Sequence, residues 1–392
     1  MPSPLRRNAL RLQPPARLGL GCLVLLAAGS ACGHHPEIPA ETPAFVHRWN
    51  EMMYTRFGIT LPDGASAEVG FNSAFAAIAE VELTANEWKK GSPLAEVNRQ
   101  AGGEPVVIPP SLMALLQRGV ELGDLTHGAF DITWAALWGV WDFNANPPHI
   151  PEPGAIQQRL ALINYQRLEL DPGAGTAHLP TAGMAIGLGG IAKGWALDRA
   201  ADTLHSAGMT DFLLQGGGQF LAAGAHGDRP WRVGIQDPRG SPDDIIATVE
   251  LHDTSISTSG DYERYFEIDG VRYHHILDPH TGMPTRGLRS ATVICKEATL
   301  ADALSTALMV LGLTPALELA AQLPGVEVIL VDDLGQLHAS PGITPYLHIQ
   351  EVSLQQQGLL PIHVQKESGP PGEVVTKPLP PGRQTAQATA TR

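Results

Sequence analysis

The sequence is poor in charge, in cysteine and in long apolar runs. Charged residues make up only 17% of the 392-residue chain and hydrophobic residues 43%, a balance that argues against a largely disordered protein. Three cysteines are too few to stabilise a chain of this length through disulfide bonds, which excludes a small disulfide scaffold. No apolar stretch reaches the roughly 20 residues that a membrane-spanning helix needs.

Basic residues are also scarce, because 26 Lys and Arg stand against 40 Asp and Glu and the formal net charge is −14. A protein that coats nucleic acid needs a basic surface, so we expect no nucleic acid among the partners. Glycine and proline, by contrast, are abundant, with 42 and 33 residues. They predict a body with many turns and loops.

The beginning of the chain predicts an export signal. Residues 1–31 combine a leader that contains four arginines and no acidic residue with an apolar run over 18–28 and small residues before Cys32. We therefore expect a cleaved signal peptide and a periplasmic protein. Cys32 resembles the lipidated cysteine of a bacterial lipoprotein, so a lipid anchor in the inner membrane and simple release both remain open. Residues 32–45 would form a linker.

Residues 46–345 form the predicted folded body, and residues 346–392, rich in Pro, Gly and Gln, a disordered tail. Within the body, apolar spacing predicts helices and strands that alternate irregularly. This favours an α+β fold over a doubly wound sheet. The expected helices cover 71–83, 112–122, 191–205 and 300–311, and the expected strands cover 212–214, 231–235, 247–251, 291–295 and 326–331.

A glycine-rich turn over 187–194 (GLGGIAKG) opens the helix expected over 191–205. Glycines let the backbone approach a ligand closely, and free amides at a helix start favour an anion such as phosphate. Lys193 would add a positive charge. The glycine spacing matches neither the Rossmann nor the Walker pattern. On these residues alone, a tight turn before a helix is at least as good an interpretation.

Three oxygen-bearing side chains share one stripe of the helix expected over 300–311. Asp302, Ser305 and Thr306 stand at positions i, i+3 and i+4. Hard oxygen ligands of this kind suit Mg²⁺. The alternative is a capping box formed by Thr299 and Asp302, which would use the carboxylate structurally. The residues alone slightly favour the cap.

Three histidines fall within the segment 273–282 (YHHILDPHTG). They could indicate a zinc site, but His274 and His275 are adjacent and point to opposite sides of an extended chain. A single histidine that acts as a general base is easier to build.

Another segment, GAFDIT at 128–133, is followed by Trp134, Trp138 and Trp141. Tryptophans offer a flat apolar surface for a ring system. Ordinary core packing explains an aromatic cluster more often than a ligand does, so both interpretations stay open.

Together these stretches resemble the ApbE family of FAD:protein FMN transferases. Five family motifs are matched in order, namely the glycine turn, WRVGI, TSGDYERYF, HILDP and DALSTA. The match spans about residues 46–345 and so covers the whole predicted body. The resemblance implies an α+β, T-fold-like body with a flavin cleft.

The resemblance also implies a set of site residues. Mg²⁺ would be bound by Asp302, Ser305 and Thr306, with a carbonyl contribution near Gly190, while Thr299 would stay free to cap the helix. His275 occupies the position of the base that activates the acceptor threonine. The implied FAD contacts are Met53, Trp88, Ala129, Phe130, Asp131 and Lys193.

The chain departs from the family pattern at several positions. Gly187 stands where family members usually carry a flavin-contacting Asp, and Tyr54 replaces the glycine of Met-Gly-Thr. Gln215 and Gln219 stand where the family usually has Asn and an acidic residue. These departures bear on FAD affinity and turnover, and they leave the metal stripe and the histidine intact.

The implied activity is Mg²⁺-dependent transfer of FMN from FAD to a threonine of an acceptor flavoprotein, with release of AMP. The acceptor would be a subunit of a membrane electron-transfer complex. One alternative is a FAD pyrophosphatase, in which water replaces the threonine. The other is a non-catalytic flavin-binding lipoprotein, for which Gly187 is the best support.

Overall fold

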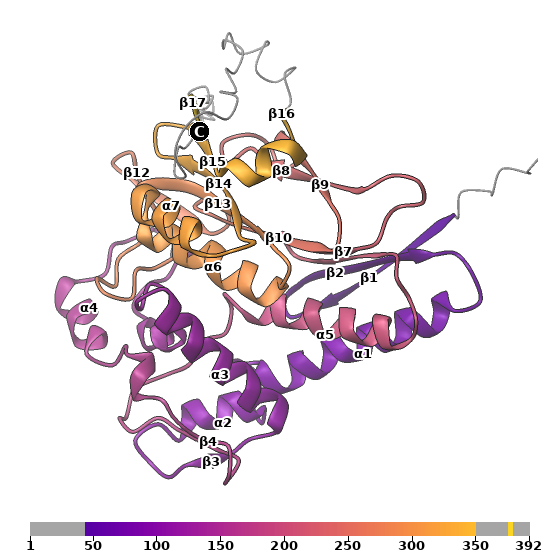
Figure 1. Cartoon of the computed structure of the whole chain (residues 1–392). Helices are drawn as coiled ribbons and strands as arrows, with labels where there is room; N and C mark the ends of the chain where they lie inside the picture. Colours follow the sequence, from indigo (N-terminus) through magenta and orange to yellow (C-terminus); the bar gives the residue numbers. More distant parts are fainter. Residues whose placement is uncertain (1–43, 350–374, 379–392) are drawn as a thin grey trace, which may run out of the picture. The chain divides into compact units, whose positions relative to one another are not determined.

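The computed structural model describes residues 44–349 and 375–378, all within one compact unit (Figure 1). The predicted signal peptide, Cys32 and most of the predicted tail lie outside these ranges. None of the helices in the described ranges is long and apolar enough to cross a membrane.

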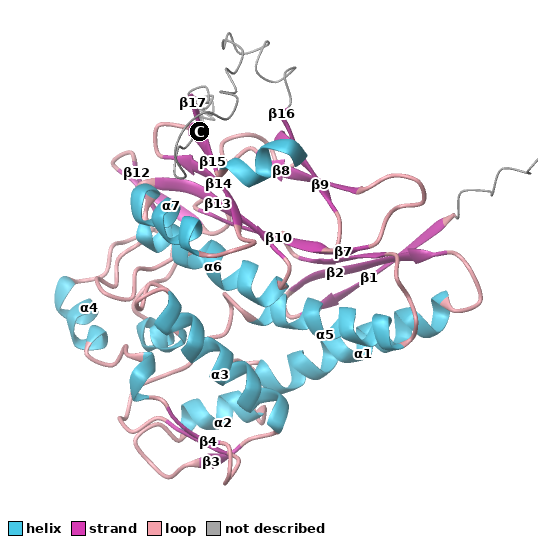
Figure 2. Ribbon diagram, viewed as in Figure 1, coloured by secondary structure: helices cyan, strands magenta, loops and turns pink. Residues whose placement is uncertain are grey.

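A nine-stranded sheet forms the centre of the fold (Figure 2). Its order is β1-β2-β6-β7-β10-β13-β14-β15-β17, and every pair of neighbours is antiparallel. The strands are β1 (Phe45–Met52), β2 (Thr55–Pro62), β6 (Phe212–Gly216), β7 (Gln219–Ala223), β10 (Thr254–Gly260), β13 (Leu288–Cys295), β14 (Glu327–Asp332), β15 (Gln336–Ala339) and β17 (Val375–Pro378).

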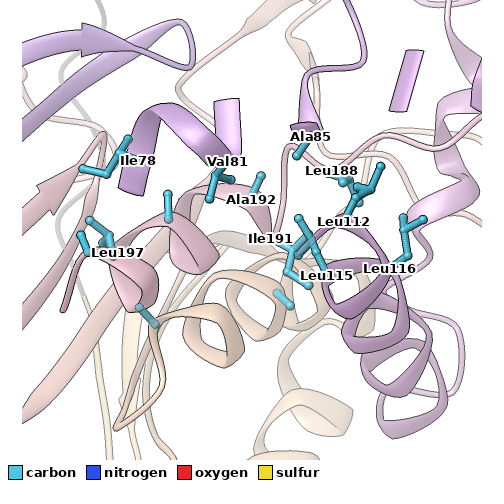
Figure 3. Close-up of a cluster of buried hydrophobic side chains, with 14 of the residues drawn as sticks. Ile78, Val81, Ala85, Leu112, Leu115, Leu116, Leu188, Ile191, Ala192 and Leu197 are labelled. Carbon is cyan, nitrogen blue, oxygen red and sulfur yellow. The ribbon is translucent and has the colours of Figure 1, made fainter. Parts of the chain in front are cut away.

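Helices cover one face of this sheet, with α5 packed between α1 and α6 (Figure 2). Figure 3 shows side chains of α1, α3 and α5 meeting around the glycine-rich turn. Leu188 and Ile191 of that turn are fully buried, so they anchor it to the core. The helices are α1 (Ala67–Ala85), α2 (Pro93–Arg99), α3 (Pro110–Leu125), α4 (Pro153–Leu160), α5 (Ala192–Ser206), α6 (Ala298–Leu311) and α7 (Leu313–Gln322).

A three-stranded sheet covers the opposite face of the large sheet. Its order is β16-β9-β8, with β8 (Trp231–Gln236), β9 (Ile245–Leu251) and β16 (Leu347–Ile349). On β13, Ala291 and Val293 pack against the helices, whereas Ile294 packs against the small sheet. Because both faces of β13 are buried, its sequence is an almost continuous apolar run rather than an alternating one.

Two smaller sheets lie outside these layers. One is the hairpin of β11 (Tyr265–Ile268) and β12 (Val271–His274), which ends directly before His275. The other joins β3 (Val106–Val107), β4 (Glu169–Asp171) and β5 (Thr176–His178). The position of the hairpin therefore determines the position of His275.

The α+β fold class is confirmed, and every expected helix and strand is present within the described residues. Two short strands, β16 and β17, fall within residues 346–392, where composition predicts disorder. β16 pairs with β9, and Leu347 packs against the core, whereas β17 pairs with the edge strand β15. Backbone pairing with an existing sheet supplies the order that the composition of these segments does not.

Candidate functional site

A cleft of about 520 Å³ brings together residues that are far apart in the sequence. Ten of the eleven predicted site residues line it, and Ser305 lies beneath its floor. The ten are Met53, Trp88, Ala129, Phe130, Asp131, Gly190, Lys193, His275, Asp302 and Thr306.

Asp302, on α6, lines this cleft and is 2% exposed. Its Oδ2 accepts a hydrogen bond of 3.0 Å from the amide of Gly194, at the start of α5. A Cβ at position 194 would lie 2.2 Å from the carbonyl oxygen of Ala298 on α6, so only glycine allows the two helices to approach this closely. Oδ1 faces the ammonium of Lys193 at 3.6 Å.

The capping box expected from Thr299 and Asp302 is wrong. The N-terminus of α6 is capped by Asp198 on α5, whose carboxylate accepts hydrogen bonds from the amides of Ala298 and Thr299 at 2.9 and 2.8 Å. The hydroxyl of Thr299 also donates to Asp198 and caps nothing itself. A carboxylate from a neighbouring helix thus satisfies the helix start, and Asp302 is free to face the cleft.

We expect Asp198→Ala to lower the free energy of unfolding by about 1–3 kcal/mol, because it leaves two amides of the first turn of α6 without an acceptor. Urea denaturation measures the loss. Asp202→Ala is the matched control, since Asp202 lies on the same helix and forms only an exposed pair with Arg199. Equal unfolding midpoints for both variants would show that Asp198 is not the cap.

The oxygen-bearing side chains of α6 differ in whether they reach the cleft. Thr306 lines the cleft, and its hydroxyl lies 3.2 Å from where a Cβ of Gly190 would stand. Ser305 is fully buried, donates to the carbonyl of Asp302 at 2.8 Å and contacts the hydroxyl of Ser259 at 2.8 Å. Ser305 therefore needs a small rotation before its oxygen can reach a ligand in the cleft.

These residues fit a hard divalent cation. The cleft offers the Asp302 carboxylate, the Thr306 hydroxyl and the carbonyls of the glycine turn, which are the oxygen ligands that Mg²⁺ prefers. The ammonium of Lys193 lies 2.8 Å from the carbonyl of Gly189 and near Asp302, so a positive charge is already attracted to this position. Among the described residues, no group of three or more His, Cys, Asp or Glu is placed to hold a metal ion.

The charge of the lining supports the same conclusion. Five acidic side chains line the cleft against two basic ones, Lys193 and Arg264. An anionic pyrophosphate would be repelled by such a surface unless a cation came with it. The five are Glu82, Glu87, Asp131, Glu263 and Asp302.

His275 lines the cleft, whereas the adjacent His274 does not. His274 is 2% exposed, and its Nε2 lies 3.0 Å from the carbonyl oxygen of Thr285. Nδ1 of His275 is buried without a hydrogen-bond partner, so Nε2 is the ring nitrogen that can act on a ligand. Burial is the largest cause of a low pKa of His275, about 4, and His274 and nearby cations add to it. The imidazole is therefore neutral at neutral pH and can accept a proton.

A buried ion cluster holds the hairpin that delivers His275. Asp261 follows β10 and accepts two hydrogen bonds of 2.6 Å from Arg239, on the loop after β8. Arg272 of β12 lies 3.5 Å from the same carboxylate. The backbone amide of His275 donates to the carbonyl of Arg264 at 3.0 Å. Side chains from two loops and from β12 itself thus fix the hairpin against the large sheet.

Asp131 lines the cleft, but its carboxylate is used by the protein. It accepts hydrogen bonds from the amide and hydroxyl of Thr133 at 2.7 and 2.6 Å, and from the amide of Tyr165 at 3.0 Å. Burial raises the pKa of Asp131, and these hydrogen bonds oppose that shift. Any ligand contact at this position would therefore be made by the backbone rather than by the charge.

The rim of the cleft carries a strained turn between β1 and β2. Met53 and Tyr54 have φ angles of 51° and 58°, in the left-handed region that disfavours residues with a Cβ. The amide of Met53 donates to Glu82 at 3.0 Å, which stabilises the turn. Tyr54, at the position of the family's glycine, is 73% exposed. Strain of this kind is typical of functional positions.

The tryptophans after Asp131 fit both interpretations of the sequence, because some lie at the cleft and one belongs to the core. Trp134 lines the cleft, and Trp138 packs in a tilted arrangement against the cleft residue Trp88 with ring centroids 4.4 Å apart. Trp141 belongs to the core, where its Nε1 donates to the carbonyl of Gly282 at 2.8 Å.

Sequence reasoning missed several residues of the site. Glu263 and Arg264 lie inside the motif TSGDYERYF and line the cleft. Two adjacent charged residues after a buried strand were the sequence signal that could have identified them. Glu82 and Glu87 lie at and just after the end of α1, where acidic residues look like an ordinary solvated surface. Burial raises the pKa of Glu87, which marks it as unlike a surface carboxylate.

Comparisons with known proteins match this geometry. A profile of the ApbE family matches residues 53–330. The chain is 33% identical over 300 residues to a FAD:protein FMN transferase of Treponema pallidum, covering 73% of this chain and 83% of that protein. It is 33% identical over 274 residues to one of Vibrio cholerae, covering 68% and 81%.

Solved structures agree. The ApbE protein of Thermotoga maritima superposes with a TM-score of 0.71 at 31% identity, covering 77% of this chain and 99% of that one. The flavin transferase ApbE of Vibrio cholerae gives 0.70 at 29% identity, covering 78% and 99%.

Proposed function

The chain belongs to the ApbE family, and on that premise we propose that it is a Mg²⁺-dependent FAD:protein FMN transferase that releases AMP. The observation that carries the proposal is the convergence of Asp302, Lys193 and His275 on one cleft. An anion-binding helix start, a hard-oxygen stripe and a neutral imidazole are the parts that phosphoryl transfer needs.

The residues have separate tasks in this reaction. Lys193 and the amides of the glycine turn hold the FAD pyrophosphate. Nε2 of His275 takes the proton from a threonine hydroxyl, whose oxygen forms a bond to the FMN-side phosphorus. The bond from that phosphorus to the bridging oxygen breaks, and AMP leaves with the electron pair. Burial lowers the pKa of His275 to about 4, so the imidazole is neutral at neutral pH and its Nε2 can accept this proton.

Asp302, Thr306 and the carbonyl of Gly190 would hold Mg²⁺, with Ser305 after rotation. Such an ion would supply Lewis-acid polarisation of a phosphoryl oxygen and would neutralise charge on the leaving group. The lining supports this assignment, because its acidic surplus disfavours an anion that binds alone.

AMP release tests the assignment. The purified protein, FAD and Mg²⁺ are mixed with and without a flavin-free acceptor domain from a membrane electron-transfer complex, and AMP is quantified. We expect AMP to form only with acceptor and to stop on chelation of Mg²⁺. AMP formed at the same rate without acceptor would indicate a pyrophosphatase, and intact FAD in all samples a non-catalytic binder.

The start of the sequence supports a second proposal, on the cellular location. We propose that the protein is exported, acts in the periplasm and is either anchored in the inner membrane through a lipid on Cys32 or released. The basic leader, short apolar run and small residues before Cys32 support this. The partner would be a periplasm-facing flavoprotein subunit of a membrane electron-transfer complex.

We expect residues 1–31 to be absent from the mature protein. Mass spectrometry of the protein purified from its membrane and soluble periplasmic fractions measures the new N-terminus and any lipid on Cys32. Replacing the arginines of the leader (Arg6, Arg7, Arg11 and Arg17) by Ser is the control, because it should impair export and leave the precursor uncleaved. An intact Met1 terminus on the exported wild-type protein contradicts the signal assignment.

A further inference from the structure

Trp134 in the wall of the cleft is paired with the buried Gly187, which precedes the cleft residue Leu188. The amide of Gly187 donates to the carbonyl of Ile132 at 2.8 Å, and its carbonyl accepts a hydrogen bond of 3.1 Å from Nε1 of Trp134. Both backbone groups of Gly187 are thus tied to the short helix Ile132–Leu137. The indole is held in one orientation by the glycine beneath it.

Little space is left between the two residues. A Cβ at position 187 would lie 3.0 Å from Nε1 and 3.2 Å from Cε2 of Trp134, and 3.0 Å from the Cβ of Ala135. Gly187 has no positive φ angle, so the space beside the indole, and not the backbone conformation, favours glycine here. A residue with a Cβ would push the indole aside by a few tenths of an ångström, because Ala135 belongs to a buried helix.

The indole faces the cleft. Trp134 is half-buried and lines the cavity, with its remaining surface against Trp138 at a centroid distance of 6.3 Å and against the neighbouring apolar cluster. Trp138 in turn packs against Trp88 with the two rings tilted by 38°, and Trp88 is 59% exposed at the same cleft. The wall is therefore an aromatic surface of fixed orientation rather than a charged one.

We propose that Trp134 is a ring-binding residue that stacks against a planar fused ring of the FAD. The hydrogen bond from its Nε1 to Gly187 holds the indole in the orientation needed for stacking. The proposal rests on the proposed function in taking FAD as the ligand. FAD carries two such rings, the isoalloxazine and the adenine, and both share the stacking chemistry.

Equilibrium binding tests the proposal without turnover as the readout. FAD is titrated into the purified mature protein in Mg²⁺ buffer without acceptor, and FMN and ADP are titrated in parallel. We expect Trp134→Leu to weaken FAD binding about tenfold and Trp134→Phe, which keeps a ring, to stay within about threefold of wild type. Loss for FMN identifies the isoalloxazine as the stacked ring, and loss for ADP identifies the adenine.

The pair itself is tested by a double-mutant cycle. Gly187→Ala should weaken FAD binding several-fold in the wild type but have no further effect in Trp134→Leu, because the indole it displaces is already gone. Trp49→Leu is the matched control, since Trp49 is an exposed tryptophan outside the cleft. Thermal melting confirms that each variant is folded.

Two outcomes are distinguishable. If wild type binds FAD and folded Trp134→Leu binds it with unchanged affinity, the ring-binding role is wrong and the proposed function stands. If wild type binds neither FAD, FMN nor ADP, the proposed function fails, and the role of Trp134 fails with it.

Discussion

His275→Ala is expected to bind FAD nearly as well as wild type but to transfer FMN about 10²–10⁴-fold more slowly. Nε2 is the ring nitrogen available to the cleft, and removing it takes away the proton acceptor without removing Lys193 or the glycine turn. The low pKa keeps the imidazole neutral, so the lost group is a base and not a cation that holds the pyrophosphate. Single-turnover transfer and FAD titration measure the two quantities separately.

His280→Ala is the control for this prediction, because His280 is exposed in the same segment, hydrogen-bonds to Asp278 and does not line the cleft. His274 is a poor control, since it is buried and hydrogen-bonded to Thr285. If His275→Ala transfers FMN at the wild-type rate, the base lies elsewhere. If it loses FAD binding instead, His275 is a ligand contact and not the base.

Asp302→Asn is expected to lower Mg²⁺-dependent FAD cleavage by on the order of 10³-fold, because the carboxylate is the only charged group of the oxygen stripe. The amide keeps an oxygen that can accept the hydrogen bond of Gly194, so the contact between α5 and α6 is preserved. Asp302→Ala would lose that contact as well and cost about 1–3 kcal/mol of stability. AMP release and thermal melting measure the two effects.

Asp198→Ala is the matched control for Asp302→Asn. It removes the cap of the same helix, so it should melt lower and yet keep its activity in the folded fraction. If Asp302→Asn melts like wild type and also cleaves FAD at the full Mg²⁺-dependent rate, the metal assignment is wrong. If Asp198→Ala loses catalysis at a temperature where it is folded, the helix start contributes to the site.

The sequence predicted the parts of the site that lie within single segments. The spacing of Asp302 and Thr306 on one helix, and the alternation of His274 and His275, are local patterns that survive folding unchanged. The resemblance to a family then indicated that these segments meet in one cleft. Without it, the residues alone favoured a cap for Asp302.

Contacts between distant segments could not be predicted from local patterns. The cap of α6 comes from Asp198, 100 residues earlier than the amide of Ala298. Glu82 and Glu87 become cleft residues only because the end of α1 lies beside the glycine turn (Figure 3). The pairing of Trp134 with Gly187 likewise depends on tertiary packing. Such residues carry no periodic or spacing signal, since the partner that gives them a role lies elsewhere in the chain.

The most direct test of the transferase assignment is the mass of the acceptor after the reaction. A flavin-free acceptor domain is incubated with the mature protein, FAD and Mg²⁺, next to a sample in which the acceptor threonine is replaced by Ala. We predict that the acceptor gains the mass of one FMN less one water, on that threonine, with an equal amount of AMP, and that the Ala acceptor gains nothing. Free FMN and AMP with an unmodified acceptor, or FAD recovered intact, would contradict the assignment.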